Sequence, residues 1–315
     1  MTSGIDLGTS YATIGVWQDD AVTIIRRGAC LPVDSSIPGC IAFTPTGHLV
    51  GDTAKKQIKI NPHNTVYGFT GSPFNVIDQD GTPAVKVDHK GESRIYTVEE
   101  LVAMVLSKAK IIAEAHLRRK VSGAVITVPS LWNSLQSSMV KDAATIARLN
   151  VLPMISAPTC AALQFGLALQ EEAERNVLVC DLGGAHCDVS LLAIEAGVYE
   201  VKAVAGDTDL GGMDLCDTFS MCRLREGYEA AMSSLSAVSE TTIELVSFFG
   251  GIDYRTTITR TKFIESVLRD SHIDKGSTHN IVLVGGSMRI PKIRKLVQDF
   301  FGGNRVCHII RFFCF

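Results

Sequence analysis

One short pattern occurs twice in this chain, and the repeat limits the folds that the chain can adopt. Residues 5–14 contain an apolar stretch, then aspartate, leucine and glycine, then small residues and a second apolar stretch, and residues 180–189 repeat this order. The aspartates of the two copies, Asp6 and Asp181, are 175 residues apart. Because glycine permits a tight turn between paired strands, each copy predicts a β-hairpin. A repeat at this spacing in a chain of 315 residues indicates two related lobes.

Short β-type runs and helical patterns alternate along the rest of the chain. The clearest helix follows Thr97, where Thr97 and Glu100 match a capping box, and its apolar periodicity extends to about Leu117. The alternation predicts an α/β fold. Further helices are expected from Ser134, after Pro158 and after Pro291, and strands at residues 12–17, 21–26, 84–88, 124–128, 177–180, 189–194, 199–204, 241–245 and 281–284.

Charge and hydropathy argue against several classes of function. The chain has 30 Lys and Arg residues against 33 Asp and Glu, and a net charge of −3 disfavours general electrostatic binding to nucleic acid or to anionic membranes. No apolar run approaches the roughly 20 residues that span a bilayer. No basic and apolar leader follows Met1, so a cytoplasmic location is expected. The nine cysteines match no zinc spacing and are expected to be reduced and buried.

The two repeated hairpins are candidate phosphate-binding turns. A glycine turn lets backbone N–H groups approach an anion, and Thr9 and Ser10 add hydroxyl groups at the first turn. Asp6 and Asp181 end the preceding strands and are suited to a hydrated Mg²⁺ ion, which binds one or two carboxylates together with phosphate oxygens. One such hairpin alone is more often an ordinary turn. Two copies at this spacing favour a pair of turns that bind a polyphosphate from both sides.

Two further glycine turns, at residues 206–212 and 284–291, are candidates for binding a nucleotide base. Gly285 and Gly286 would permit close backbone approach, and the guanidinium of Arg289 could stack on a purine. A glycine pair before a helix is, taken alone, more often a plain strand-to-helix turn.

Eight short motifs follow one another along the chain, at residues 6–11, 50–55, 61–66, 124–129, 181–184, 206–212, 251–254 and 282–292. Their order closely resembles the ATPase domain of the heat-shock protein 70 chaperones. The resemblance implies an actin-like fold, in which two duplicated ribonuclease H-like lobes surround a cleft that holds Mg-ATP or Mg-ADP. We therefore expect lobe I at residues 1–170, a shortened lobe II at residues 171–300 and an apolar tail at residues 301–315, with the peptide-binding domain absent.

The resemblance also implies roles for individual residues of this chain. Asp6 and Asp181 are the expected Mg²⁺ ligands, and Asp181 and Asp188 are the expected catalytic carboxylates. The expected nucleotide-binding residues are Gly8, Thr9, Ser10, Tyr11, Gly183, Gly184, Ala185, His186, Gly211, Gly212, Glu229, Ser236, Gly285, Gly286, Ser287 and Arg289.

Several departures from the family pattern fall on groups that the family uses for hydrolysis. The family's lysine segment after Tyr67 has no counterpart, an acidic residue is replaced by Ala157, and a glycine and threonine of the second turn are replaced by Ala185 and His186. His186 is either a substitute phosphate donor or, as we favour because imidazole is larger than a hydroxyl, a residue that crowds the phosphate. Within residues 229–236 the family's Lys-Arg pair is Met232-Ser233.

Two losses concern architecture. The helical insertion between residues 212 and 223 and the helix after Phe263 are much shortened, and residues 307–315 stand where the family continues into a closing helix, a linker and a peptide-binding domain. An apolar tail of this kind would bury itself, bind a partner or aggregate, or it reflects how the coding sequence was assembled.

The sequence therefore predicts a nucleotide-binding domain of the heat-shock protein 70 type, associated with protein folding, whose ATP hydrolysis is weak or absent. The alternatives are a non-enzymatic adaptor of the ribosome-associated type, a sugar or acid kinase of the wider superfamily, and a non-functional truncated copy. Expected partners are J-domain proteins, nucleotide exchange factors or ribosome-associated factors. No direct peptide binding, nucleic acid or membrane is expected.

Overall fold

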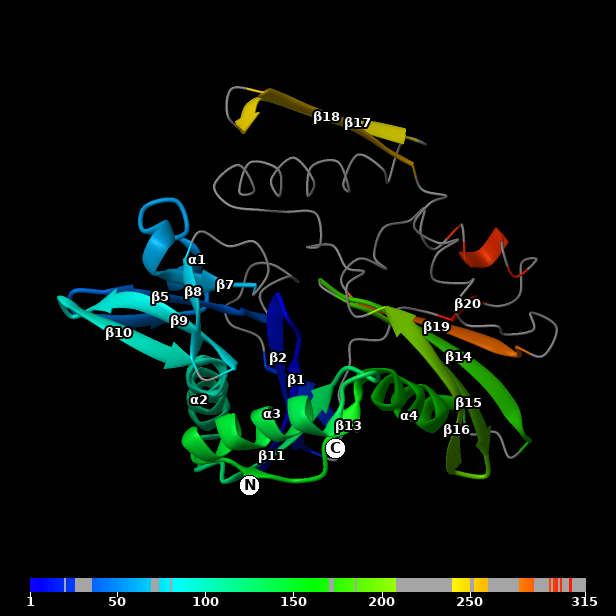
Figure 1. The fold of residues 1–315 in the computed structure, drawn as a ribbon. Helices are drawn as coiled ribbons and strands as arrows, with labels where there is room; N and C mark the ends of the chain where they lie inside the picture. The colour runs from blue at the N-terminus through cyan, green and yellow to red at the C-terminus, as the bar shows by residue number, and fades with distance from the viewer. Residues whose placement is uncertain are drawn as a thin grey trace. The chain divides into compact units, whose positions relative to one another are not determined.

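A computed structural model describes residues 1–19, 21–25, 36–68, 74–79, 81–169, 173–184, 186–207, 240–249, 252–259, 278–285, 295, 297–299, 301 and 306–307 (Figure 1). The chain divides into two compact units. The first contains Met1–Val128 and Trp132–Ile155, and the second contains Pro129–Leu131 and the described residues from Ser156 onward. Both units combine β-sheets with helices, which confirms the predicted α/β class.

The main sheet of the first unit is built around the first repeated hairpin. Its strand order is β12-β11-β1-β2-β3, from β12 (Asn150–Val151), β11 (Gly123–Val128), β1 (Thr2–Leu7), β2 (Tyr11–Gln18) and β3 (Ala21–Ile24). β1 is antiparallel to β2 and parallel to β11. Two short strands complete this sheet: β4 (Ser36–Pro38) pairs with β2, and β13 (Ile155–Ser156) pairs with β11.

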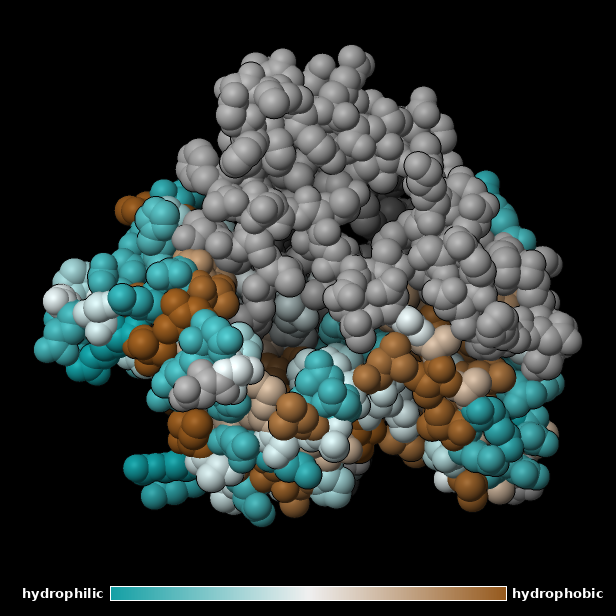
Figure 2. Space-filling model, viewed as in Figure 1, coloured by the Kyte–Doolittle hydropathy of each residue, from teal (hydrophilic) through white to brown (hydrophobic). Residues whose placement is uncertain are grey.

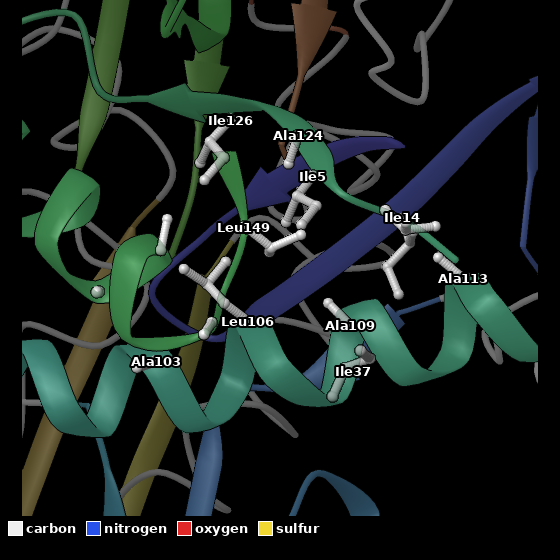
Figure 3. Packing of buried hydrophobic residues seen from close by; sticks show 14 of the residues in the cluster. Ile5, Ile14, Ile37, Ala103, Leu106, Ala109, Ala113, Ala124, Ile126 and Leu149 are labelled. Carbon is white, nitrogen blue, oxygen red and sulfur yellow. The ribbon is translucent and has the colours of Figure 1, made fainter. Parts of the chain in front are cut away.

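Two helices, α2 (Val98–Leu117) and α3 (Ser134–Ile146), provide the other side of the first core. Ile5 and Ile14 of the hairpin pack with Leu106 and Ala109 of α2, and all four side chains are at most 2% exposed (Figure 3). A fully buried Leu or Ile contributes roughly 1.5–3 kcal/mol relative to an exposed one. The hairpin is therefore fixed by a close-packed core.

Local sequence signals set the ends of these helices. Thr97 and Glu100 form the predicted capping box, with the Glu100 N–H donating to Thr97 Oγ1 at 3.3 Å and the Thr97 N–H donating to the Glu100 carboxylate at 2.9 Å. The helix ends at Leu117, as predicted, and is followed by a left-handed residue, Arg118. A second capping box, formed by Asn133 and Gln136, begins α3. Both helices are thus confirmed at their N-termini by side chains close in sequence.

The first unit contains two smaller sheets. One has the order β6-β5-β7 and carries helix α1 (Asp52–Lys55) and the 3₁₀ turn η1 (Pro62–Asn64), and the other has the order β10-β9-β8. Phe43, which is fully buried, lies at the centre of their shared core and stacks on Tyr96 with ring centroids 4.6 Å apart. The strands are β5 (Cys40–Thr44), β6 (Gly47–Val50), β7 (Thr65–Tyr67), β8 (Asn75–Gln79), β9 (Thr82–His89) and β10 (Glu92–Thr97).

The main sheet of the second unit repeats the topology of the first. Its order is β20-β19-β14-β15-β16, from β20 (Val306–Cys307), β19 (Asn280–Val284), β14 (Arg175–Leu182), β15 (Cys187–Glu195) and β16 (Val198–Asp207). β14 is antiparallel to β15 and parallel to β19, just as β1 is to β2 and β11. Hairpin register is also repeated, because Leu7 pairs with Ala12 and Leu182 pairs with Cys187. The predicted duplication is confirmed strand by strand.

The remaining elements of the second unit refine the predicted boundaries. Helix α4 (Ala157–Leu169) packs on β14, β15 and β19, so the division between units lies at residues 155 and 156 and not at residue 170. The helix was expected after Pro158 but begins one residue before it, because proline is tolerated in a first turn. Residues 306–307, assigned to the tail, form edge strand β20. β17 (Glu240–Phe249) and β18 (Ile252–Thr259) form a separate hairpin.

Three further outcomes concern the helix after Pro291, the cysteines and the surface. The described residues of the predicted helix, Lys295 and 297–299, are helical. Cys40, Cys180 and Cys187 are buried and not in disulfides, as expected, but Cys160 is disulfide-bonded, so the prediction is wrong there. Sequence spacing cannot show which sulfurs the fold brings together. In the described part of the chain no helix is long and apolar enough to cross a membrane. On the face shown in Figure 2, apolar and hydrophilic residues of the described part are interspersed.

Candidate functional site

The first glycine turn joins β1 to β2. The Gly8 N–H donates to the Tyr11 carbonyl at 3.1 Å and closes the turn, and the Gly39 N–H donates to the Ser10 carbonyl at 2.9 Å. A Cβ atom on Gly8 would lie only 2.8 Å from the Tyr11 carbonyl oxygen, so the turn requires glycine at this position. The carbonyl oxygens of Tyr11 and Ser10 therefore both accept a hydrogen bond from the protein backbone.

The second glycine turn, between β14 and β15, closes in the same way. The Gly183 N–H donates to the His186 carbonyl at 3.0 Å. A Cβ atom on Gly183 would lie 3.5 Å from that carbonyl oxygen, which is an ordinary contact, so this turn is less tight than the first. The predicted hairpins with glycine turns are therefore both confirmed, while their binding of phosphate stays a prediction.

Each turn is preceded by an aspartate, and the two have different surroundings. Asp6 is partly buried and accepts a hydrogen bond from the Thr127 hydroxyl at 2.6 Å, because parallel pairing puts Thr127 of β11 opposite it. Asp181 is 5% exposed and lies opposite Val284 of β19. Burial, with a smaller contribution from the Asp181 charge, raises the pKa of the neighbouring Cys180 thiol to about 12. That thiol therefore stays protonated at neutral pH. Metal binding by Asp6 and Asp181 stays a prediction.

Asp188 lies opposite Asp181 in the β14–β15 pair and is 1% exposed. The Ser130 backbone N–H donates to its carboxylate at 3.2 Å. Burial raises the pKa of Asp188, while the Ser130 hydrogen bond and the nearby His186 act in the opposite direction. The second hairpin thus brings two buried carboxylates to one strand end. Their catalytic role stays a prediction.

The His186 side chain folds back over its own turn. Its Nε2 and Cε1 atoms lie 3.7 and 3.8 Å from the position that a Cβ atom on Gly183 would occupy. The imidazole therefore lies within van der Waals distance of the Gly183 Cβ position. Crowding of a phosphate by His186 stays a prediction.

The structure shows why position 285 requires glycine, which the sequence did not reveal. Its φ is 86°, and a Cβ atom would lie 2.1 Å from the Leu182 carbonyl oxygen and 2.7 Å from Oδ1 of Asp181. Glycine is thus required where the end of β19 passes the end of β14. The predicted close approach at this position is made by the protein's own backbone, and binding of a base there stays a prediction.

The structure groups the predicted residues into two sets, one in each unit. Asp6 and residues 8–11 lie at the end of β1, and Asp181, Asp188 and the described turn residues Gly183, Gly184 and His186 lie at the end of β14. Ala157, the substituted acidic position, is the first residue of α4 and is 7% exposed. The predicted residues outside the described part of the chain are Ala185, Gly211, Gly212, Glu229, Ser236, Gly286, Ser287 and Arg289.

Sequence reasoning missed two groups that contact the aspartates, Thr127 and Ser130. Thr127 lies near the end of β11, in a stretch that the sequence analysis gave only as a strand and a family motif, and Ser130 follows just after that motif. A hydroxyl residue at the end of a strand parallel to β1 was the available signal. It could be used only once the pairing of β1 with β11 was known.

The duplicated α/β units, each with a glycine-turn hairpin and an aspartate at its strand end, define the class of actin-like ATPase folds. The family model described as "Hsp70 protein" matches residues 2–220 and 215–310. The chain belongs to the Hsp70 family.

Curated relatives agree with this assignment. The chain is 44% identical to a heat shock 70 kDa protein of Emericella nidulans over 350 residues, which covers 95% of this chain and 54% of the relative. It is 43% identical to heat shock 70 kDa protein 2 of Paracoccidioides lutzii, covering 96% and 54%. It is 39% identical to a ribosome-associated molecular chaperone of Saccharomyces cerevisiae, covering 96% and 57%. The chain thus spans about half the length of the curated relatives that it matches.

The alignments also bear on the predicted shortening. The match to the Emericella nidulans protein runs over 350 positions, more than the 315 residues of this chain. The relative therefore carries residues within the aligned region that this chain lacks.

Proposed function

We propose that this chain is a nucleotide-binding domain that binds Mg-ATP or Mg-ADP through its two glycine turns and hydrolyses ATP weakly or not at all. The observation that carries the proposal is the duplicated hairpin. Both turns close through the same glycine N–H to carbonyl hydrogen bond, at 3.1 and 3.0 Å, and both follow a strand that ends in aspartate and leucine. Turns of this kind present backbone N–H groups to phosphate.

The donor set fits magnesium. Mg²⁺ prefers oxygen ligands and usually keeps several waters, so it needs only one or two protein carboxylates together with phosphate oxygens. Asp6 and Asp181 supply such carboxylates, and Thr127 holds the Asp6 carboxylate by a 2.6 Å hydrogen bond. Bound Mg²⁺ would neutralise part of the phosphate charge. This chain's own residues orient the carboxylates, and the glycine turns bind the phosphates.

Loss of hydrolysis follows from the side chains that are missing. Phosphoryl transfer depends on positioning a water and stabilising developing charge, and each such group typically contributes on the order of 10²–10³ in rate. Ala157 offers no carboxylate, and His186 covers its turn where the family has a hydroxyl. Asp181 and Asp188 remain as the proposed catalytic carboxylates, but alone they cannot position the water.

Calorimetric titration with ATP in the presence and absence of Mg²⁺ tests the binding. We expect Asp6→Asn and Asp181→Asn each to weaken Mg-dependent binding, while Asp142→Asn, an exposed aspartate on α3, leaves it unchanged. If the two strand-end variants bind as tightly as the parent protein, these aspartates do not form the site.

A second candidate is a non-enzymatic adaptor associated with the ribosome. It is favoured by the matches to two yeast relatives whose names describe ribosome-associated chaperones, and by the same missing catalytic groups. These relatives also support the predicted cytoplasmic location. Co-sedimentation with purified ribosomes, with and without ATP, separates this function from nucleotide binding alone. J-domain proteins and nucleotide exchange factors are the other proposed partners.

A further inference from the structure

A lysine that the sequence analysis did not single out lies beside the first glycine turn. The Lys55 ammonium donates to the Tyr11 hydroxyl at 2.9 Å and lies 5.4 Å from the centroid of the Tyr11 ring. The two residues are 44 positions apart in the sequence. Tyr11 closes the turn with its own carbonyl, so the Lys55 charge is tied to a residue of the turn itself.

The backbone beneath Lys55 is fixed. Helix α1 is held by the Gly51 N–H, which donates to the Cys40 carbonyl at 2.9 Å, and the Lys55 N–H donates to the Gly51 carbonyl at 2.8 Å. Ala54, the preceding residue, is fully buried against Cys40. The helix therefore sits rigidly on β5, and the lysine side chain extends from an anchored position.

The Lys55–Tyr11 contact contributes little to the stability of the fold. Both side chains are exposed, and a polar contact between exposed groups typically contributes about 0–1 kcal/mol because it orders two side chains in water. In the described part of the chain the structure gives Lys55 no carboxylate partner. Among the described residues, the Tyr11 side chain is thus the group that the structure places at the Lys55 ammonium.

We propose that Lys55 binds the phosphates of the nucleotide at the first glycine turn and that Tyr11 positions it there. This inference rests on the proposed nucleotide binding. A lysine supplies a compact, mobile charge for phosphate without a fixed bonding geometry, which suits a side chain that reaches the turn from a neighbouring sheet.

Titration calorimetry of the full chain with Mg-ATP, Mg-ADP and adenosine tests the assignment. Lys55→Met should weaken ATP binding by about three- to tenfold, as expected for one partly solvated charge, and should weaken ADP binding less. Adenosine carries no phosphate, so its affinity should not change. Lys55→Arg should keep most of the affinity, and Tyr11→Phe should show an intermediate loss. The Lys55→Met loss should shrink as salt concentration rises.

Lys56→Met is the matched control, because Lys56 is the next residue, is also exposed and changes the net charge equally. If Lys55→Met and Lys56→Met lose the same ATP affinity, the effect comes from net charge alone and the assignment is wrong. The assignment is also wrong if neither variant loses ATP affinity. If the parent protein binds neither ATP nor adenosine, the proposed function itself fails. If the parent protein binds both ATP and adenosine and Lys55→Met binds ATP equally tightly, only this inference fails.

Discussion

Substitution of Gly285 by alanine tests the close approach of two strand ends in the second unit. Gly285 follows β19 with φ of 86°, and an added Cβ atom would lie 2.1 Å from the Leu182 carbonyl oxygen. That oxygen belongs to the backbone at the end of β14, so it cannot swing aside as a side chain would. The Cβ atom would also lie 2.7 Å from Oδ1 of Asp181, the proposed metal ligand.

The size of the effect follows from two separate costs. A left-handed backbone costs a residue with a Cβ atom about 1–2 kcal/mol. Overpacking against a fixed neighbour adds typically about 1–3 kcal/mol. Gly197, in the turn between β15 and β16, separates the two costs because its φ is 80° but no atom lies within 4 Å of an added Cβ. Gly197→Ala therefore carries only the first cost, and Gly285→Ala carries both.

Urea and thermal unfolding of both variants measure the difference. An excess of about 2 kcal/mol for Gly285→Ala would lower the Tm by about 4–8 °C relative to Gly197→Ala, for a unit of 150–250 residues. Hydrogen exchange at the amides of β14 and β19 would localise the loss, which matters because a protein of two units need not unfold in one step. If Gly285→Ala is no less stable than Gly197→Ala, the two strand ends do not approach as described.

Three further predictions concern a helix cap, a buried histidine and hydrolysis. Thr97→Ala should lower the free energy of unfolding by about 1 kcal/mol, because it removes the side chain that caps α2; urea denaturation measures this, and no change would contradict the role of the cap. Burial, and then nearby positive charges, lower the pKa of His89, which contacts Tyr96. Because the unfolded chain binds this proton more readily, stability should fall as the pH drops from 6.5 through the lowered pKa, and thermal melts of His89→Phe should depend less on pH over that window. A pH profile unchanged by the substitution would show that another group is responsible. Ala157→Glu combined with His186→Thr should recover little hydrolysis in single-turnover assays while the lysine segment is absent; a rate near that of an intact family member would refute the catalytic argument.

Interactions between residues close in sequence could be predicted without the structure. The capping box joins Thr97 to Glu100, three positions apart, and the hydrogen bond that closes each repeated hairpin joins residues at the same separation, so these interactions can be recognised in the sequence itself. The duplication was also visible, because both copies keep the same order of strand, aspartate and glycine. These features determined the α/β class and the position of both candidate turns.

Contacts between distant parts of the chain were decided only by the tertiary structure. Thr127 reaches Asp6 across 121 residues because β1 and β11 are parallel neighbours, and Ser130 reaches Asp188 across 58. Lys55 likewise meets Tyr11 through the packing of α1 on β5. Parallel pairing and sheet packing join strands through long connections whose register no local pattern encodes. The sequence thus predicts where the turns and carboxylates occur, and the three-dimensional packing determines which groups form hydrogen bonds to them.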